Sequence, residues 1–294
     1  KIDNAMSNKN SNVLAIGIMF FLFAMISFVT GLQNPMGVIV KTQFGATNAM
    51  SQLGNLANFI AYAFMGLPAG FILKKYGYKI TALAAGAVGF IGVFVSFISG
   101  VVELFPVYLI GAFISGFSMC MLNIVVNPML NTLGGGGNKG NQLIQLGGVF
   151  NSSAAVACYI LMGALIADAT KAKISDATPA LMIALAIFVI AFIVIIFTKI
   201  EEPEQAPVQL DLIKGAMGHS HFALGTLAIF LYMGIEVGTP TYILQYLTSD
   251  QVPGGAMDAS IVGWIVAVYW LMMLIGRFVG SAIAGKVSSR AMIS

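Results

Sequence analysis

Charged residues and cysteines are scarce in this chain of 294 residues. Only 9% of the residues are charged, whereas roughly a quarter are charged in a typical soluble domain. Hydrophobic residues make up 59%, and the mean hydropathy is +0.92. This composition excludes an ordinary soluble domain. The two cysteines, Cys120 and Cys158, are too few for a disulfide framework or a cysteine-based metal site.

Sequence motifs of enzymes and of nucleotide-binding proteins are also missing. The chain contains neither HExxH nor GxSxG, and the glycine run 134–137 lacks the Lys-Ser/Thr ending of a phosphate-binding loop. No run of basic residues suggests nucleic-acid binding. The sequence therefore predicts no enzyme, no cofactor, no metal site and no nucleic-acid partner.

Long uncharged stretches dominate what is present. A helix needs about 20 apolar residues to cross a bilayer, and eight stretches are near or above that length once Glu236 is allowed inside one of them. They predict an all-α membrane protein with eight transmembrane helices. The stretches are 10–40, 42–73, 80–102, 104–138, 140–167, 177–198, 222–249 and 259–276.

The basic residues predict the orientation in the membrane. With the N-terminus on the cytoplasmic side, eleven of the 14 Lys and Arg residues, Arg277 among them, fall on that side. Only Lys41, Lys171 and Lys173 fall on the other side. Because Lys and Arg concentrate in cytoplasmic loops, we expect a cytoplasmic N-terminus.

The sequence divides into two unequal parts. We predict a six-helix bundle over residues 1–199, a cytoplasmic linker over 200–221 and the start of a second bundle over 222–294. Similar features recur in both parts: Pro35 and Pro240 are 205 residues apart, and Gly70 and Gly280 are 210 apart. Two parallel six-helix halves form the major facilitator fold. On this interpretation the chain holds eight of an expected twelve helices.

Amide side chains recur at helical spacing on several predicted helices. Steps of three and four place side chains on one face of a helix. Five helices with polar faces favour a shared cavity, and amides suit a neutral polyhydroxylated ligand such as a sugar. The alternative is that these groups only join helix to helix. The predicted substrate-binding residues are Gln33, Asn34, Asn55, Asn58, Tyr62, Asn123, Asn127, Gln145, Asn151, Tyr232, Thr239 and Trp270.

Glu236 is the acidic residue inside a membrane-length stretch. Hydrocarbon solvates a carboxylate poorly, so such a residue usually faces a polar cavity and handles protons or ions. We predict that Glu236 is a proton-coupling site. The alternative is a buried structural carboxylate bonded to Tyr232 or to a neighbouring amide.

Three segments resemble a known family. They are GLPAGFILKKYGYK at 66–79, NPMLNTLG followed by VFNSSAA across 127–155, and FLYMGIEVGTPTYI at 230–243. Together they are similar to the fucose–galactose–glucose:proton symporter family of the major facilitator superfamily. The resemblance implies a multi-pass protein of the bacterial cytoplasmic membrane. The chain differs from the family pattern at three places. Acidic residues are usual in the family at the positions of Gln33-Asn34 and Asn123, and Gln is usual at the position of Gly148.

The function predicted from these features is secondary transport of a sugar or similar neutral polar solute by alternating access. Protons are the expected coupling ion, the lipid bilayer is the surroundings, and the expected state is a monomer. Two alternatives stay open: an uncoupled uniporter or exporter, and a transporter-like sensor that binds solute without moving it.

Overall fold

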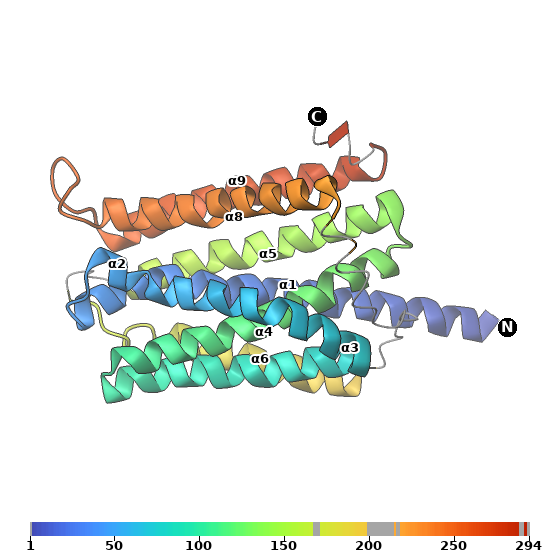
Figure 1. Cartoon of the computed structure of the whole chain (residues 1–294), viewed down its shortest axis with the longest axis horizontal. Coiled ribbons are helices and arrows are strands. Elements are labelled where there is room, and N and C mark those ends of the chain that lie inside the picture. The colour runs from blue at the N-terminus through green and yellow to red at the C-terminus, as the bar shows by residue number, and fades with distance from the viewer. Residues whose placement is uncertain (1, 167–170, 199–214, 216–217, 288–290, 293–294) are drawn as a thin grey trace.

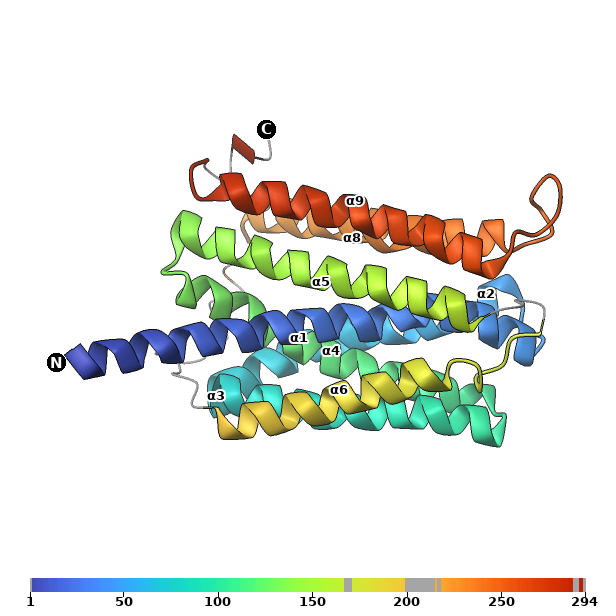
Figure 2. The same ribbon diagram turned by 180° about the vertical axis from the view of Figure 1, so that it is seen from behind.

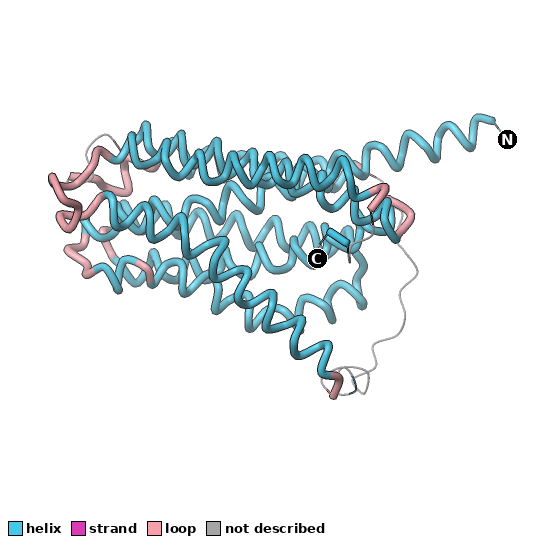
Figure 3. Tube along the Cα trace, turned by 90° about the horizontal axis from the view of Figure 1, so that it is seen from above, coloured by secondary structure: helices cyan, strands magenta, loops and turns pink. Residues whose placement is uncertain are grey.

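The structure is a computed structural model that describes residues 2–166, 171–198, 215, 218–287 and 291–292. Within this part of the chain the elements are helical and run in roughly the same direction, although one helix diverges from the bundle toward one end (Figure 3). The helices are α1 (Ile2–Gln43), α2 (Asn48–Ser51), α3 (Leu53–Val102), α4 (Phe105–Leu133), α5 (Gly137–Leu165), α6 (Thr178–Phe197), α8 (Ser220–Leu247) and α9 (Ala259–Ala284).

Helix α3 accounts for two of the eight predicted crossings. Its 50 residues would extend about 75 Å as one straight helix, more than twice the hydrocarbon thickness of about 30 Å. It bends at Gly77, whose φ of 83° lies in the region that favours glycine. Seven described helices are long and apolar enough to span a membrane. Because the bend divides α3 into two of the predicted stretches, these seven helices correspond to the eight predicted crossings.

The turn around Gly77 also forms hydrogen bonds with the end of α6. Lys79 Nζ donates hydrogen bonds to the carbonyl oxygens of Ile196 and Thr198, each at 2.8 Å. Ile196 lies in the last turn of α6 and Thr198 is its C-cap, where carbonyl oxygens have no intrahelical donors. The basic turn therefore caps α6 from a distant part of the chain.

The long helix α1 lies at the centre of the bundle. It has α5 on one side and α4 and α6 on the other, and α8 and α9 lie beyond α5 (Figures 1 and 2). Met19, Leu22 and Ile39 of α1 are fully buried in the core. The start of α1 and the end of α9 both point toward the same end of the molecule, as an even number of crossings requires (Figure 1).

Helices α5 and α9 connect the first six crossings to the last two. A Cβ on Gly263 would lie 3.1 Å from the Cα of Gly163, so the two backbones approach closely. Around this contact Tyr159, Val266 and Trp270 form a second apolar cluster. The predicted linker, 200–221, falls mostly outside the described residues, and α8 begins at Ser220. The division into two halves stays a prediction.

Candidate functional site: a polar central cavity

A cavity of about 570 Å³ opens among α1, α3, α4, α5, α8 and α9. Ten predicted residues line it, from six helices. They are Asn34, Asn55, Tyr62, Asn123, Asn127, Gln145, Asn151, Tyr232, Glu236 and Trp270. Phe23, Ile26 and Phe59 add apolar surface. The cavity thus combines apolar walls with convergent polar groups, as small-molecule sites usually do.

Three predicted residues lie elsewhere. Gln33, next to Asn34 on α1, is buried in the bundle and accepts a hydrogen bond from the Tyr108 hydroxyl at 3.1 Å. A step of one residue turns a side chain by about 100° on a helix, so Gln33 and Asn34 cannot face the same space. Thr239 is partly buried on α8 and does not line the cavity.

Asn58 is the other exception, and its position is set by close packing. Its side chain is 1% exposed. A Cβ on Gly116 of α4 would lie 2.3 Å from the Asn58 carbonyl oxygen, so α4 passes directly against this turn of α3. Asn58 therefore lies in a helix contact, outside the cavity lining.

Asn34 is the centre of a hydrogen-bond network at one end of the cavity. Its Nδ2 donates to the Tyr159 hydroxyl at 2.6 Å. Its Oδ1 accepts from Asn55 Nδ2 and, at 2.8 Å, from Thr241 Oγ1. One amide of α1 thereby joins α3, α5 and α8, and its orientation is fixed.

The amides of α4 form a second polar wall. Asn123 Nδ2 donates to the Tyr62 hydroxyl at 3.3 Å and to the Met119 carbonyl oxygen at 3.1 Å. Asn127 Nδ2 donates to the Asn123 carbonyl oxygen at 3.0 Å. These bonds fix the side chains while leaving them at the cavity surface.

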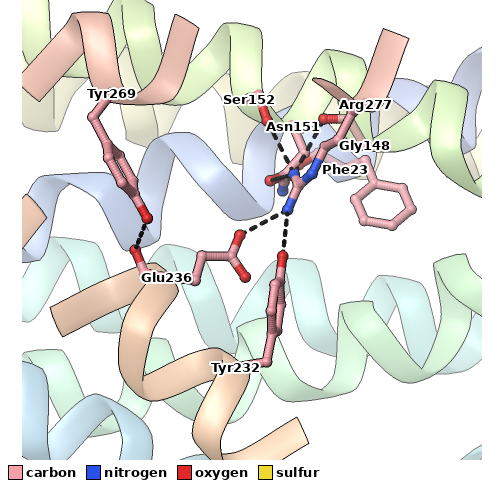
Figure 4. A network of polar contacts seen from close by, with 8 residues as sticks. All are labelled: Phe23, Gly148, Asn151, Ser152, Tyr232, Glu236, Tyr269 and Arg277. Atoms are coloured by element: carbon pink, nitrogen blue, oxygen red, sulfur yellow. Dashed lines mark hydrogen bonds and ion pairs between the residues drawn. The ribbon is translucent and has the colours of Figure 1, made fainter. Parts of the chain in front are cut away.

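Glu236 forms an ion pair with Arg277. Arg277 Nη2 lies 2.7 Å from Glu236 Oε1, and the Glu236 side chain is 8% exposed (Figure 4). Tyr232, one turn before Glu236 on α8, points to the same guanidinium (Figure 4). The Tyr269 hydroxyl donates to the backbone oxygen of Glu236 at 3.2 Å. The carboxylate thus has a charged partner, which the sequence alone did not reveal.

The other edge of the Arg277 guanidinium contacts α5. Nη1 donates to Ser152 Oγ at 3.0 Å, to Asn151 Oδ1 at 3.1 Å and to the Gly148 carbonyl oxygen at 3.2 Å. A Cβ on Gly148 would lie 3.0 Å from Arg277 Cδ, so the arginine packs closely against this residue. Arg277 therefore connects α5 to α8 through one rigid planar group.

The expectation that the last membrane-length stretch ends before Arg277 was wrong. Helix α9 continues to Ala284, beyond the uncharged stretch that ends at residue 276, and Arg277 lines the central cavity. The mostly apolar residues that follow Arg277, from Phe278 to Ala284, were the signal that could have located it. Glu236 and Arg277 are the lining residues with a formal charge, and the two charges cancel.

The fold and the cavity define a multi-pass helical membrane protein with a polar site between its helices. Residues 19–294 match the Major Facilitator Superfamily, and the chain belongs to that superfamily. It is 28% identical over 283 residues to the glucose/galactose transporter of Brucella abortus, covering 94% of this chain and 68% of the relative.

Two further comparisons agree with this assignment. The chain is 20% identical over 321 residues to the L-fucose-proton symporter of Escherichia coli, covering 100% of this chain and 72% of the relative. A crystal structure of the Escherichia coli fucose:proton symporter has the same fold, with a TM-score of 0.72 at 18% identity, covering 95% of this chain and 72% of that one. The resemblance found in the three sequence segments is thus confirmed.

Proposed function

We propose that this protein is a secondary transporter that carries a sugar or similar neutral polar solute by alternating access, coupled to protons through Glu236. The observation that carries the proposal is the central cavity, in which amides from four helices surround a single, compensated ion pair. The relatives named as glucose/galactose transporters and L-fucose-proton symporters support the same substrate class.

The chemistry of the lining suits a neutral solute. Amides offer donors and acceptors without a fixed charge, and the formal charges of Glu236 and Arg277 cancel. The cavity volume of about 570 Å³ falls in the ordinary range for small-molecule sites. Tyr159 and Trp270, whose ring centroids are 6.3 Å apart at an interplanar angle of 21°, supply an aromatic wall beside the amides.

The ion pair provides a physical basis for proton coupling. A lone charge within a membrane protein is costly, and a paired one is far less so. With Glu236 ionised, the empty carrier holds a neutral pair. A proton on Glu236 would weaken its hold on Arg277 Nη2 while the α5 contacts of Nη1 remain. Protonation of Glu236 would therefore weaken the link from α8 through Arg277 to α5. A coupling site must change the contacts between helices in this way.

Uptake by the full-length protein in proteoliposomes tests the proposal. Glucose, galactose and fucose should each be compared with and without an imposed pH gradient, with protein-free liposomes as the control. We expect at least one of these sugars to accumulate above its external concentration only when the gradient is present. A protonophore should reduce this accumulation to equilibration.

The remaining outcomes distinguish the alternatives. Sugar that equilibrates across the membrane to the same extent with and without the pH gradient would indicate an uncoupled uniporter or exporter. Binding without uptake would indicate a sensor, and neither binding nor uptake of any sugar would refute the substrate class. The proposed location is the bacterial cytoplasmic membrane, with the N-terminus on the cytoplasmic side.

A further inference from the structure

A second cavity, of about 390 Å³, lies at the end of the molecule where α2 and the last turns of α8 meet. Apart from Ala49 and Gly238, its lining side chains are amides, hydroxyls and tyrosines without a formal charge. It therefore repeats, in a separate place, the polar and uncharged chemistry of the central cavity.

One layer of side-chain hydrogen bonds separates the two cavities. Thr241 lines the second cavity and Asn34 lines the central one, and Thr241 Oγ1 donates to Asn34 Oδ1 at 2.8 Å. One turn further along α8, Gln245 Nε2 donates to Ser51 Oγ at 3.2 Å. The two spaces thus lie in sequence along α8, and the Asn34–Thr241 bond lies between their linings. These two polar side chains can exchange that bond for bonds to a polar solute.

Two tyrosines form a flat wall of the second cavity. The rings of Tyr242 and Tyr246 stack with centroids 5.8 Å apart and an interplanar angle of 3°. Tyr242 is 69% exposed. A tyrosine side chain offers an apolar ring face and a polar hydroxyl edge, which matches a sugar ring with its apolar C–H face and polar rim.

Tyrosines near a helix end also occur as membrane-interface anchors. An anchor requires no enclosed space behind it. Here the tyrosine pair shares a cavity with Asn48, Gln52 and Gln245, and this combination favours a binding site over an anchor.

We propose that the second cavity is an additional binding site for the same neutral polyhydroxylated solute, occupied before the Asn34–Thr241 layer admits the solute to the central cavity. The inference rests on the proposed function. With the N-terminus cytoplasmic, the site serves solute that arrives from the outer face.

The test compares Tyr242→Leu with Tyr242→Phe in vesicles of known orientation. The half-saturating sugar concentration is measured for transport starting from each face. Tyr242→Leu removes the aromatic wall and should raise that concentration roughly fivefold or more from the second-cavity face, a change of about 1 kcal/mol. The value from the other face should stay within about twofold. Tyr242→Phe keeps the ring and loses only the hydroxyl, so from the second-cavity face it should change less than Tyr242→Leu, and from the other face it should resemble the wild type.

Thr248→Val is the matched control. Thr248 is the C-cap residue directly after α8, its Oγ1 donates to the Leu244 carbonyl oxygen at 2.7 Å, and it does not line the second cavity. For Thr248→Val, the half-saturating sugar concentrations measured from the two faces should equal those of the wild type. Asn48→Ala is the second test variant, in case Tyr242→Leu yields no folded protein, and it should show the same one-sided change.

A wild type that transports sugar while both test variants behave normally, or change equally at both faces, would overturn the second site and leave the proposed function intact. A wild type that transports none of the sugars would refute the proposed function itself, and the second site with it.

Discussion

At the scale of single residues, Arg277 determines how Glu236 can act. Its guanidinium reaches the carboxylate with one edge and three acceptors of α5 with the other. The fork geometry of arginine permits this bridging, and the compact ammonium of lysine does not. The pair places opposite charges on α9 and α8 inside one cavity. If Glu236 takes up a proton, as proposed, the change acts on both helices.

Replacement of Glu236 by Gln should separate binding from coupling. Gln keeps the oxygen that accepts from Arg277 Nη2 but has no proton to release. We expect Glu236→Gln to lose sugar accumulation driven by a pH gradient while it keeps exchange between equal sugar pools. Glu236→Ala should be worse, because Arg277 also loses its acceptor on α8. The measurement is accumulation in proteoliposomes, and normal gradient-driven accumulation by the Gln variant would exclude Glu236 as the coupling site.

Two asparagines should respond differently to the same substitution. Asn127 lines the cavity and Asn58 lies in the contact of α3 with α4. Loss of about 1–2 kcal/mol of hydrogen bonding in Asn127→Ala should weaken sugar affinity roughly 5- to 30-fold. In Asn58→Ala we expect unchanged affinity and an altered yield of folded protein. Sugar binding and the monodisperse yield in detergent are measured for both variants, and similar affinity losses in the two would show that Asn58 also contacts the solute.

At the scale of elements, small residues set the distance between α3 and α4. A Cβ on Gly92 would lie 2.5 Å from the backbone nitrogen of Ser115, and one on Gly111 would lie 2.6 Å from that of Ser96. Close backbone approach through small residues is a main source of helix association in membranes. The hydrophobic effect does not bring helices together there, because lipid tails are as apolar as the side chains. These contacts hold the α4 amides at their place in the cavity wall.

Enlarging one of these glycines should therefore destabilise the bundle. In Gly92→Ala the new methyl group meets backbone atoms, which cannot move aside as a side-chain end can. Overpacking of this kind typically costs about 1–3 kcal/mol, and we expect a lower melting temperature in detergent. Gly17→Ala is the control, because nothing lies within 4 Å of its added Cβ. A Gly92 variant as stable as the control would contradict the tight contact.

At the scale of the whole molecule, the bundle has two distinct ends. The start of α1 and the end of α9 lie toward one end, and α2 with the loop between α8 and α9 lies at the other (Figure 1). The basic turn around Lys79 lies at the end that the charge distribution predicts to be cytoplasmic. Alternating access requires each end to open in turn, so the assignment of ends decides from which side each cavity fills.

Labelling of single cysteines tests that assignment. Asn138, in the first turn of α5, and Ser175, in the loop before α6, are both exposed and lie at opposite ends of the bundle. The native Cys120 and Cys158 are buried. A cysteine at Ser175 should react with a membrane-impermeant thiol reagent added to intact cells, and one at Asn138 should react only after the cells are opened. A cysteine at Gln205, in the predicted linker outside the described residues, should behave like the one at Asn138. The reverse labelling pattern would invert the topology.

The amino-acid sequence by itself determined the helical class, the membrane crossings, the amide faces and the exceptional position of Glu236. These are local properties, because hydropathy adds along a segment and side-chain direction follows the helical period. Only the tertiary structure decided which faces meet. It brought Arg277 to a carboxylate 41 residues away and linked Asn34 to Tyr159 across 125 residues. It also placed Asn58 in the close contact between α3 and α4 at Gly116. Such choices depend on how closely two backbones can approach, and no single segment carries that information.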